Sequence, residues 1–161
     1  IIFKKPTGAA HPEVYLNGEN VEDKIRGLEV SSSVSKVAAI KEVRKFLVDQ
    51  QRMMGEQGGV VMDGRDIGSV VFPNAELKIF LTADTDIRAE RRFKELTAKG
   101  EDVDLSAIKA NLIQRDHLDS TRKESPLIQT EDAVVVDNTK LSRAEQLLLL
   151  KQLVSDRIVT I

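Results

Sequence analysis

The sequence predicts an α/β fold built around a parallel sheet. Three short apolar runs, residues 60–62, 77–81 and 133–136, are typical of buried strands. Segments whose apolar residues recur at helical spacing lie between and after these runs. Strands that alternate with helices in this way favour an α/β class over an all-helical or all-β one.

Size and composition limit the classes of protein that remain. The chain has 161 residues, of which 41% are hydrophobic, enough for about one domain with its own core. It has no cysteine, which excludes disulfides, thiol nucleophiles and cysteine-ligated zinc. Lys and Arg number 24 against 26 Asp and Glu, so no general nucleic-acid surface is indicated. Without a membrane span or signal peptide in the sequence, we expect a soluble, cytoplasmic protein with no membrane partner.

Residues 1–20 predict a small antiparallel sheet. Strands are expected around residues 1–3 and 14–16, and the second leads into Asn17-Gly18, a pair that closes hairpins. Because residue 1 is Ile and already lies in an apolar run, we expect that a segment precedes it.

From residue 21 to about residue 57 the pattern is helical. Apolar residues at spacings of three, four and seven predict a stripe that faces the core: Ile40, Val43, Leu47 and Met54. The pair Gly58-Gly59 is a stop signal, and we place the boundary between two parts of the chain there.

Residues 58–161 predict part of a sheet domain. Helices are expected near residues 86–99, 105–122 and 143–154. Ser142 and Glu145 open the last of these as a capping box.

The turn Asp63-Gly64-Arg65-Asp66 follows the first predicted core strand. Ligands gather at the carboxyl ends of such strands. Asp63 can hold a hydrated Mg²⁺, Arg65 can clamp a phosphate, and Asp66 can accept hydrogen bonds from a sugar or base. The alternative is a charged turn with an internal Arg–Asp pair.

A second signal is a helical stripe that changes character along its length. Its apolar residues are followed on the same face by charged ones: Leu105, Ile108 and Leu112, then Arg115, Asp119 and Arg122. Over a cleft, two guanidinium groups oriented by a carboxylate can neutralise a transferring phosphoryl group. The alternative is a solvated ion pair on a helix surface.

Other arginines carry weaker signals. Arg44 lies at the rim of the predicted stripe with Ser35 about two turns earlier, and spacing alone favours a surface arginine there. Arg88, Arg91 and Arg92 form a basic cluster for which a solvated helix face is the simpler interpretation, although we favour Arg92 over Arg91 for a functional role.

Taken together, these segments resemble bacterial cytidylate kinases. The most specific run is VVMDGRDIGSVVFP at residues 60–73. It is joined by four shorter matches, at residues 34–44, 88–92, 115–122 and 136–139. The resemblance covers nearly the whole chain.

The resemblance implies a fold and a division of the chain. The fold is the P-loop NTP hydrolase-like core of a nucleoside monophosphate kinase, with a parallel sheet whose N-terminal strand is missing here. Residues 1–57 would be a small α+β insert that binds the monophosphate. Residues 58–161 would be a partial kinase core with a helical lid at about residues 88–125.

The resemblance also implies an activity and a set of site residues. Members of the family transfer the γ-phosphoryl group of ATP, with Mg²⁺, to CMP or dCMP, giving CDP or dCDP. Four residues would contact CMP, with both arginines on its phosphate: Ser35, Arg44, Arg65 and Asp66. Arg115 and Arg122 would clamp the phosphates beside Asp119, and Asn138 and Thr139 would lie near the adenine of ATP.

One family feature does not occur in the sequence. It contains no GxxxxGK[ST] loop, which supplies the phosphate cradle and the Mg²⁺ ligand in such kinases. We therefore expect this chain to be inactive by itself, and to bind a complementary N-terminal piece or self-associate, whereas a full-length member would be monomeric. The alternatives are a kinase for another nucleoside monophosphate and a non-catalytic nucleotide-binding module.

Overall fold

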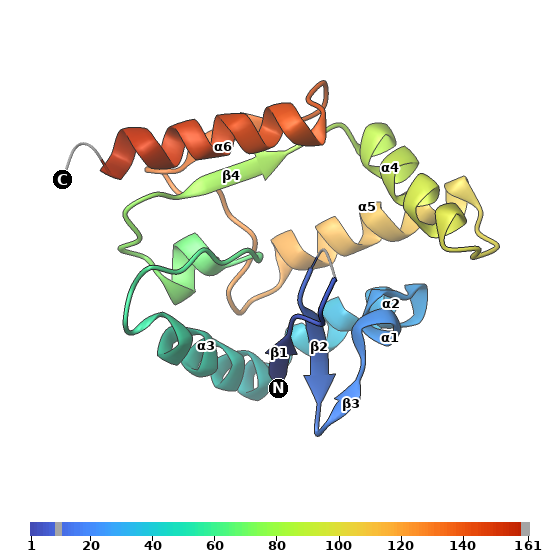
Figure 1. Cartoon of the computed structure of the whole chain (residues 1–161), viewed down its shortest axis with the longest axis horizontal. Coiled ribbons are helices and arrows are strands. Elements are labelled where there is room, and N and C mark those ends of the chain that lie inside the picture. The colour runs from blue at the N-terminus through green and yellow to red at the C-terminus, as the bar shows by residue number, and fades with distance from the viewer. Residues whose placement is uncertain (9–10, 159–161) are drawn as a thin grey trace.

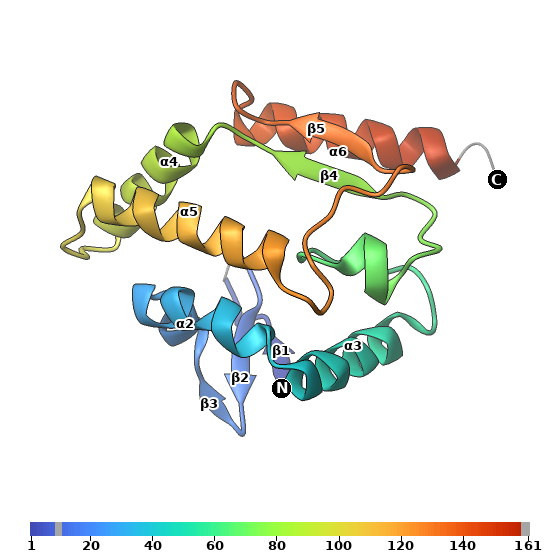
Figure 2. The same cartoon turned by 180° about the vertical axis from the view of Figure 1, so that it is seen from behind.

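The computed structural model describes residues 1–8 and 11–158. Two groups of elements are visible in Figures 1 and 2, with helix α5 running between them. The N-terminal group begins with an antiparallel sheet of β1 (Ile2–Lys4), β2 (Glu13–Leu16) and β3 (Glu19–Asn20). Asn17 and Gly18 both have positive φ, 50° and 88°, as the predicted hairpin turn requires. The expected antiparallel strands and turn are confirmed.

Three helices follow, α1 (Glu22–Arg26), α2 (Leu28–Ala38) and α3 (Lys41–Gly55). The predicted apolar stripe does not face a core: Ile40, which precedes α3, is 49% exposed, Leu47 38% and Met54 57%, and Val43 is only partly buried. The buried residues of α3 are Arg44 and Val48. The face turned inward is therefore defined by a buried arginine, which hydrophobic periodicity cannot anticipate.

The predicted strand at residues 60–62 is also wrong. These residues form no strand, and the Val61 side chain is fully exposed. A strand exists only where a neighbour completes its ladder of hydrogen bonds, and no strand lies beside this segment within the described residues. The parallel sheet consists instead of β4 (Ile79–Thr82) and β5 (Val134–Asp137), with Ile79 opposite Val134.

A π-helical turn, η1 (Ile67–Val71), follows Asp66 directly. Arg52 of α3 donates hydrogen bonds to the last carbonyl groups of this turn, through Nε to Val71 O at 3.2 Å and through Nη2 to Val70 O at 2.7 Å. These bonds satisfy carbonyls that a helix end leaves without partners. They fix the segment after Asp66 against α3.

Helices α4 (Thr85–Ala98) and α5 (Leu105–Thr121) connect β4 to β5. They pack through a small apolar core of Ala89, Leu96 and Ile108. Each helix begins at a capping aspartate, Asp84 and Asp104, whose carboxylate accepts backbone N–H groups of the first turn. The two predicted helices are confirmed.

The last helix, α6 (Arg143–Ile158), lies along the β4–β5 pair in both views (Figures 1 and 2). Its predicted capping box is confirmed: Ser142 N donates to Glu145 Oε2 at 2.8 Å, and Glu145 N donates to Ser142 Oγ at 3.2 Å. None of the helices in residues 1–8 and 11–158 is both long and apolar enough to cross a membrane.

Candidate active site

A cavity of about 200 Å³ lies between the N-terminal helices and α5. Its walls come from α2, α3, the turn at residues 64–66 and the C-terminal end of α5. Seven of the residues singled out from the sequence line it: Ser35, Arg44, Arg65, Asp66, Arg115, Asp119 and Arg122. Residues that are up to 87 positions apart in the chain therefore meet around one hollow.

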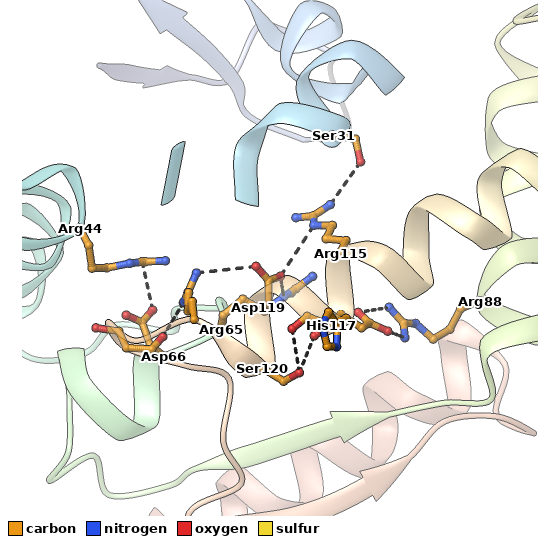
Figure 3. Close-up of polar contacts among 12 residues, drawn as sticks. Ser31, Arg44, Arg65, Asp66, Arg88, Arg115, His117, Asp119 and Ser120 are labelled. Carbon is orange, nitrogen blue, oxygen red and sulfur yellow. Dashed lines mark hydrogen bonds and ion pairs between the residues drawn. The ribbon is translucent and has the colours of Figure 1, made fainter. Parts of the chain in front are cut away.

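Asp119 is the centre of one charged cluster in the cavity wall (Figure 3). Its side chain is buried, and Arg65 Nε donates a hydrogen bond to Asp119 Oδ2 at 2.9 Å. Arg115 and Arg122 lie at ion-pair distance from the same carboxylate, 3.9 Å and 3.7 Å away. We call these three arginines and Asp119 the Asp119 cluster. One carboxylate thus orients three guanidinium groups.

Arg44 and Asp66 form a second, smaller pair (Figure 3). Arg44 Nη1 donates to Asp66 Oδ1 at 3.3 Å, and both side chains are buried. The interpretation of Arg44 as a surface arginine, which spacing alone favoured, is wrong. A buried arginine needs a charge partner, and Asp66 supplies it.

Two contacts outside the cluster fix its arginines. Arg122 donates through Nε and Nη2 to the carbonyl of Ser125, at 2.8 Å and 2.6 Å. Arg115 Nη1 donates to Ser31 Oγ at 3.3 Å, which joins α5 to α2. Ser31 was not among the predicted site residues, although its place in a run of three serines offered a signal for a polar contact.

The cavity wall carries an excess of positive charge. Four guanidinium groups and two carboxylates line it, and the other lining residues are uncharged. Burial and the nearby Arg65 lower the pKa of Arg115 below its usual value, and burial together with Arg44 lowers the pKa of Arg122. Both arginines remain charged at neutral pH. Their charges are incompletely compensated, so an anion in the cavity would be attracted.

Several buried polar atoms of the wall have no hydrogen-bond partner. Six such side-chain atoms occur in the described part of the chain, and five belong to cavity residues: Arg44 Nε, Gln51 Oε1, Asp66 Oδ2, Arg115 Nε and Arg122 Nη1. Buried polar groups are nearly always satisfied in folded proteins, by protein, water or ligand. The cavity is therefore built to hold something polar.

Three predicted residues lie outside the cavity lining: Asp63, Asn138 and Thr139. Arg91 donates to Asn138 Oδ1 at 2.9 Å and to the Asn138 carbonyl at 2.8 Å, and Thr139 Oγ1 accepts from Asp84 N at 2.9 Å. These bonds brace the loop after β5. Asp63 is exposed, and no group of three His, Asp or Glu residues suited to a metal occurs in residues 1–8 and 11–158.

The basic cluster of α4 does not line the cavity either. Arg88 makes a two-pronged contact with Asp116 of α5, and Arg92 pairs with Glu95. Arg91, which we ranked below Arg92, instead reaches the loop after β5.

Comparison with known proteins gives one consistent match. A model of the cytidylate kinase family matches residues 2–155. A cytidylate kinase of Flavobacterium johnsoniae is 51% identical over 154 residues, covering 96% of this chain and 67% of the relative. Those of Bacteroides fragilis and Porphyromonas gingivalis are 53% and 50% identical over 146 and 147 residues, covering 91% of this chain and 64% of each relative.

The chain thus spans about two thirds of the length of the curated relatives it matches. The family implies the fold of a P-loop nucleoside monophosphate kinase, and the alternation of helices with the parallel β4–β5 pair agrees with that class. With a match over nearly the whole sequence and relatives at about half identity, this chain belongs to the cytidylate kinase family.

Proposed function

We propose that the protein transfers the γ-phosphoryl group of ATP to CMP or dCMP, giving CDP or dCDP. The observation that carries the proposal is the charge of the cavity. Its four arginines exceed its two aspartates by two positive charges, which is the charge needed to neutralise a phosphate monoester dianion. The names of the relatives supply the acceptor, because all those described above are cytidylate kinases.

The Asp119 cluster is the proposed phosphate site. It has three guanidinium groups and one carboxylate, so the whole positive excess of the cavity lies in it. Arg115 Nε and Arg122 Nη1 are buried and make no hydrogen bond, and each lies only at ion-pair distance from Asp119. Phosphoryl transfer depends mostly on positioning and charge stabilisation, and fixed guanidinium groups supply both.

Arg44 and Asp66 are the proposed contacts for the base. The resemblance assigned Arg44 to the phosphate, but its ion pair with Asp66 leaves no net charge there. The pair retains one unpartnered donor, Arg44 Nε, and one unpartnered acceptor, Asp66 Oδ2. The edge of a pyrimidine offers the complementary groups. Ser35, which is buried in the same wall, is proposed to lie toward the base and sugar, as the resemblance implies.

The division into insert and lid is proposed on the same geometry. Residues 1–57 would hold the monophosphate, and residues from about 88 to 125 would form the lid. The cavity lies where α2 and α3 face α5, and the bond from Arg115 to Ser31 crosses between them. Closure of a lid of this kind would bring Arg115 and Arg122 onto the phosphates.

ATP and Mg²⁺ are proposed as co-substrate and cofactor. Mg²⁺ is commonly held by one or two carboxylates together with substrate phosphates, so the ion is proposed to arrive with ATP and to touch one carboxylate through water. Asp63 is the proposed carboxylate. Asn138 and Thr139 are proposed beside the adenine on the resemblance, and both their side chains and their backbone groups hydrogen-bond within the chain.

Replacement of Arg65 by Ala tests the proposal. Arg65→Ala in the full-length gene product should lower kcat/KM for CMP by at least about 100-fold, since it removes a charge-assisted donor from the phosphate of CMP, the acceptor of the transferred group. Arg26→Ala is the matched control, because the Arg26 side chain is exposed and pairs with Glu22 outside the cavity. Equal activity of wild type and Arg65→Ala would refute the assignment.

A panel of CMP, dCMP, UMP and AMP as acceptors settles the substrate. Preference for CMP and dCMP supports the proposal, and preference for UMP or AMP would assign the protein to another monophosphate. Tight CMP binding with no phosphorylation by the full-length gene product would instead favour a nucleotide-binding module.

A further inference from the structure

Gln51 of α3 lines the cavity and has a buried acceptor that no other part of the described chain satisfies. Its carbonyl oxygen, Oε1, has no hydrogen-bond partner, and the residue lines the cavity. Leaving such a group unsatisfied is costly, so a cavity that is roomy and polar will hold water or a ligand against it. Gln51 played no part in the sequence analysis, because a glutamine in a helix carries no signal of its own.

The position of Gln51 places it with the base contacts. Arg44, Leu47 and Gln51 all line the cavity from α3, at the spacing of residues that share one helix face. Arg44 is paired with Asp66, whereas Arg65, Arg115 and Arg122 surround Asp119. Gln51 therefore lies on the same helix as Arg44 of the Arg44–Asp66 pair, and on none of the elements that carry the Asp119 cluster.

The chemistry of an acceptor restricts its partner. A phosphate dianion has no hydrogen to donate, so Gln51 Oε1 must meet a donor elsewhere on the nucleotide. The donors of a cytidine nucleotide are the exocyclic amino group of the base and the ribose hydroxyls. The amino group has two N–H bonds, and the cavity has two buried acceptors without partners, Asp66 Oδ2 and Gln51 Oε1.

We propose that Gln51 accepts one hydrogen bond from the exocyclic amino group of the bound pyrimidine, while Asp66 accepts the other. Gln51 is then a specificity-determining residue for 4-amino pyrimidines. The proposal rests on the proposed function, since it requires that a cytidine monophosphate occupies the cavity.

A ligand that lacks only the amino group isolates this contact. Dissociation constants for CMP and for its 4-deamino analogue, pyrimidin-2-one ribonucleoside 5′-monophosphate, are measured by calorimetry on the full-length wild type and on Gln51→Met. The wild type should bind CMP more tightly than the analogue. The ratio of the two dissociation constants, which measures this preference, should fall by about three- to tenfold in the variant. An unchanged preference in Gln51→Met would overturn the proposal.

Gln50→Met is the matched control. Gln50 is the neighbouring glutamine on α3 and does not line the cavity, so its replacement should leave the preference as in the wild type.

The ratio of two dissociation constants does not depend on the folded fraction, and Gln51→Leu repeats the test with a second side chain. A fall in the preference for CMP over dCMP, with the amino-group preference intact, would place Gln51 on the ribose and overturn the proposal.

The outcome for the wild type separates the two proposals. If the wild type fails to bind or phosphorylate CMP, the proposed function fails and this inference fails with it. If the wild type phosphorylates CMP and Gln51→Met keeps the full amino-group preference, only the role of Gln51 is refuted.

Discussion

The molecule buries two regions of opposite character. Between α4 and α5 the buried side chains are apolar, with Leu96 completely inaccessible to solvent. Around the cavity they are polar or charged, and every buried polar residue of the described chain lies in its wall: Ser35, Arg44, Asp66, Asp119 and Arg122. One region is packed against itself, and the other leaves hydrogen-bonding atoms without partners.

This difference indicates how burial is divided between stability and function. Apolar burial in the α4–α5 core stabilises the fold in the absence of any ligand. Burial of like charges in the cavity wall works against the free protein, as the lowered pKa values of Arg115 and Arg122 show. A bound anion would relieve the repulsion between these charges, so the charges that destabilise the free protein would favour anion binding.

The largest expected effect comes from the core. Leu96→Ala should lower the free energy of unfolding by about 2–5 kcal/mol, because it removes packed methyl groups and leaves a cavity. Urea unfolding measures the change, and the CMP dissociation constant of the folded variant should stay that of the wild type. Leu148→Ala is the control, since Leu148 is 68% exposed and its loss should cost at most about 0.5 kcal/mol. Similar losses in both variants would contradict the assigned core.

The next effect concerns the charge of the cavity. CMP should bind at least about 100-fold more tightly than cytidine, because only CMP carries a phosphate for the Asp119 cluster. Calorimetry on the full-length gene product measures both constants. Arg115→Met should reduce the ratio of the cytidine dissociation constant to the CMP dissociation constant, while Arg26→Met should leave this ratio unchanged. Equal affinities for CMP and cytidine in the wild type would show that the excess charge does not serve a phosphate.

The smallest effect lies outside both regions, at the start of α6. Hydrogen bonding to Ser142, mainly to its side chain, lowers the pKa of Glu145 below its usual value. A carboxyl group whose pKa is lower in the folded state stabilises above its unfolded pKa and loses this contribution as pH falls through the folded value. Glu145→Gln should therefore be slightly less stable than the wild type at neutral pH. Thermal unfolding should show the difference in Tm between wild type and Glu145→Gln shrinking as the pH falls. A difference in Tm that grows in acid would contradict the capping box.

Local sequence signals predicted the fold where the structure depends on local chemistry. Asn17-Gly18 specified a hairpin, and Ser142 with Glu145 specified a helix start. They failed at residues 60–62, since an apolar run becomes a strand only beside another strand. They failed again on α3, where the buried face is set by Arg44 and its partner on a distant turn.

The candidate site was harder to predict from spacing. Arg44 was indistinguishable from a surface arginine, and Asp119 from a member of a solvated ion pair, because the partners that bury them are remote in sequence. The resemblance to a family predicted which residues act together. All seven residues that it assigned to CMP and the phosphates line the cavity. Gln51 was missed because a glutamine within a helix has no distinctive pattern, and Ser31 was missed although it lies in a run of three serines.

A crystal structure of the full-length gene product with CMP bound tests the central claim most directly. We expect phosphate oxygens within hydrogen-bond distance of the guanidinium groups of Arg65, Arg115 and Arg122, with the base against Arg44 and Asp66. A phosphate bound elsewhere, with these arginines still turned to Asp119 and no ligand in the cavity between them, would contradict it.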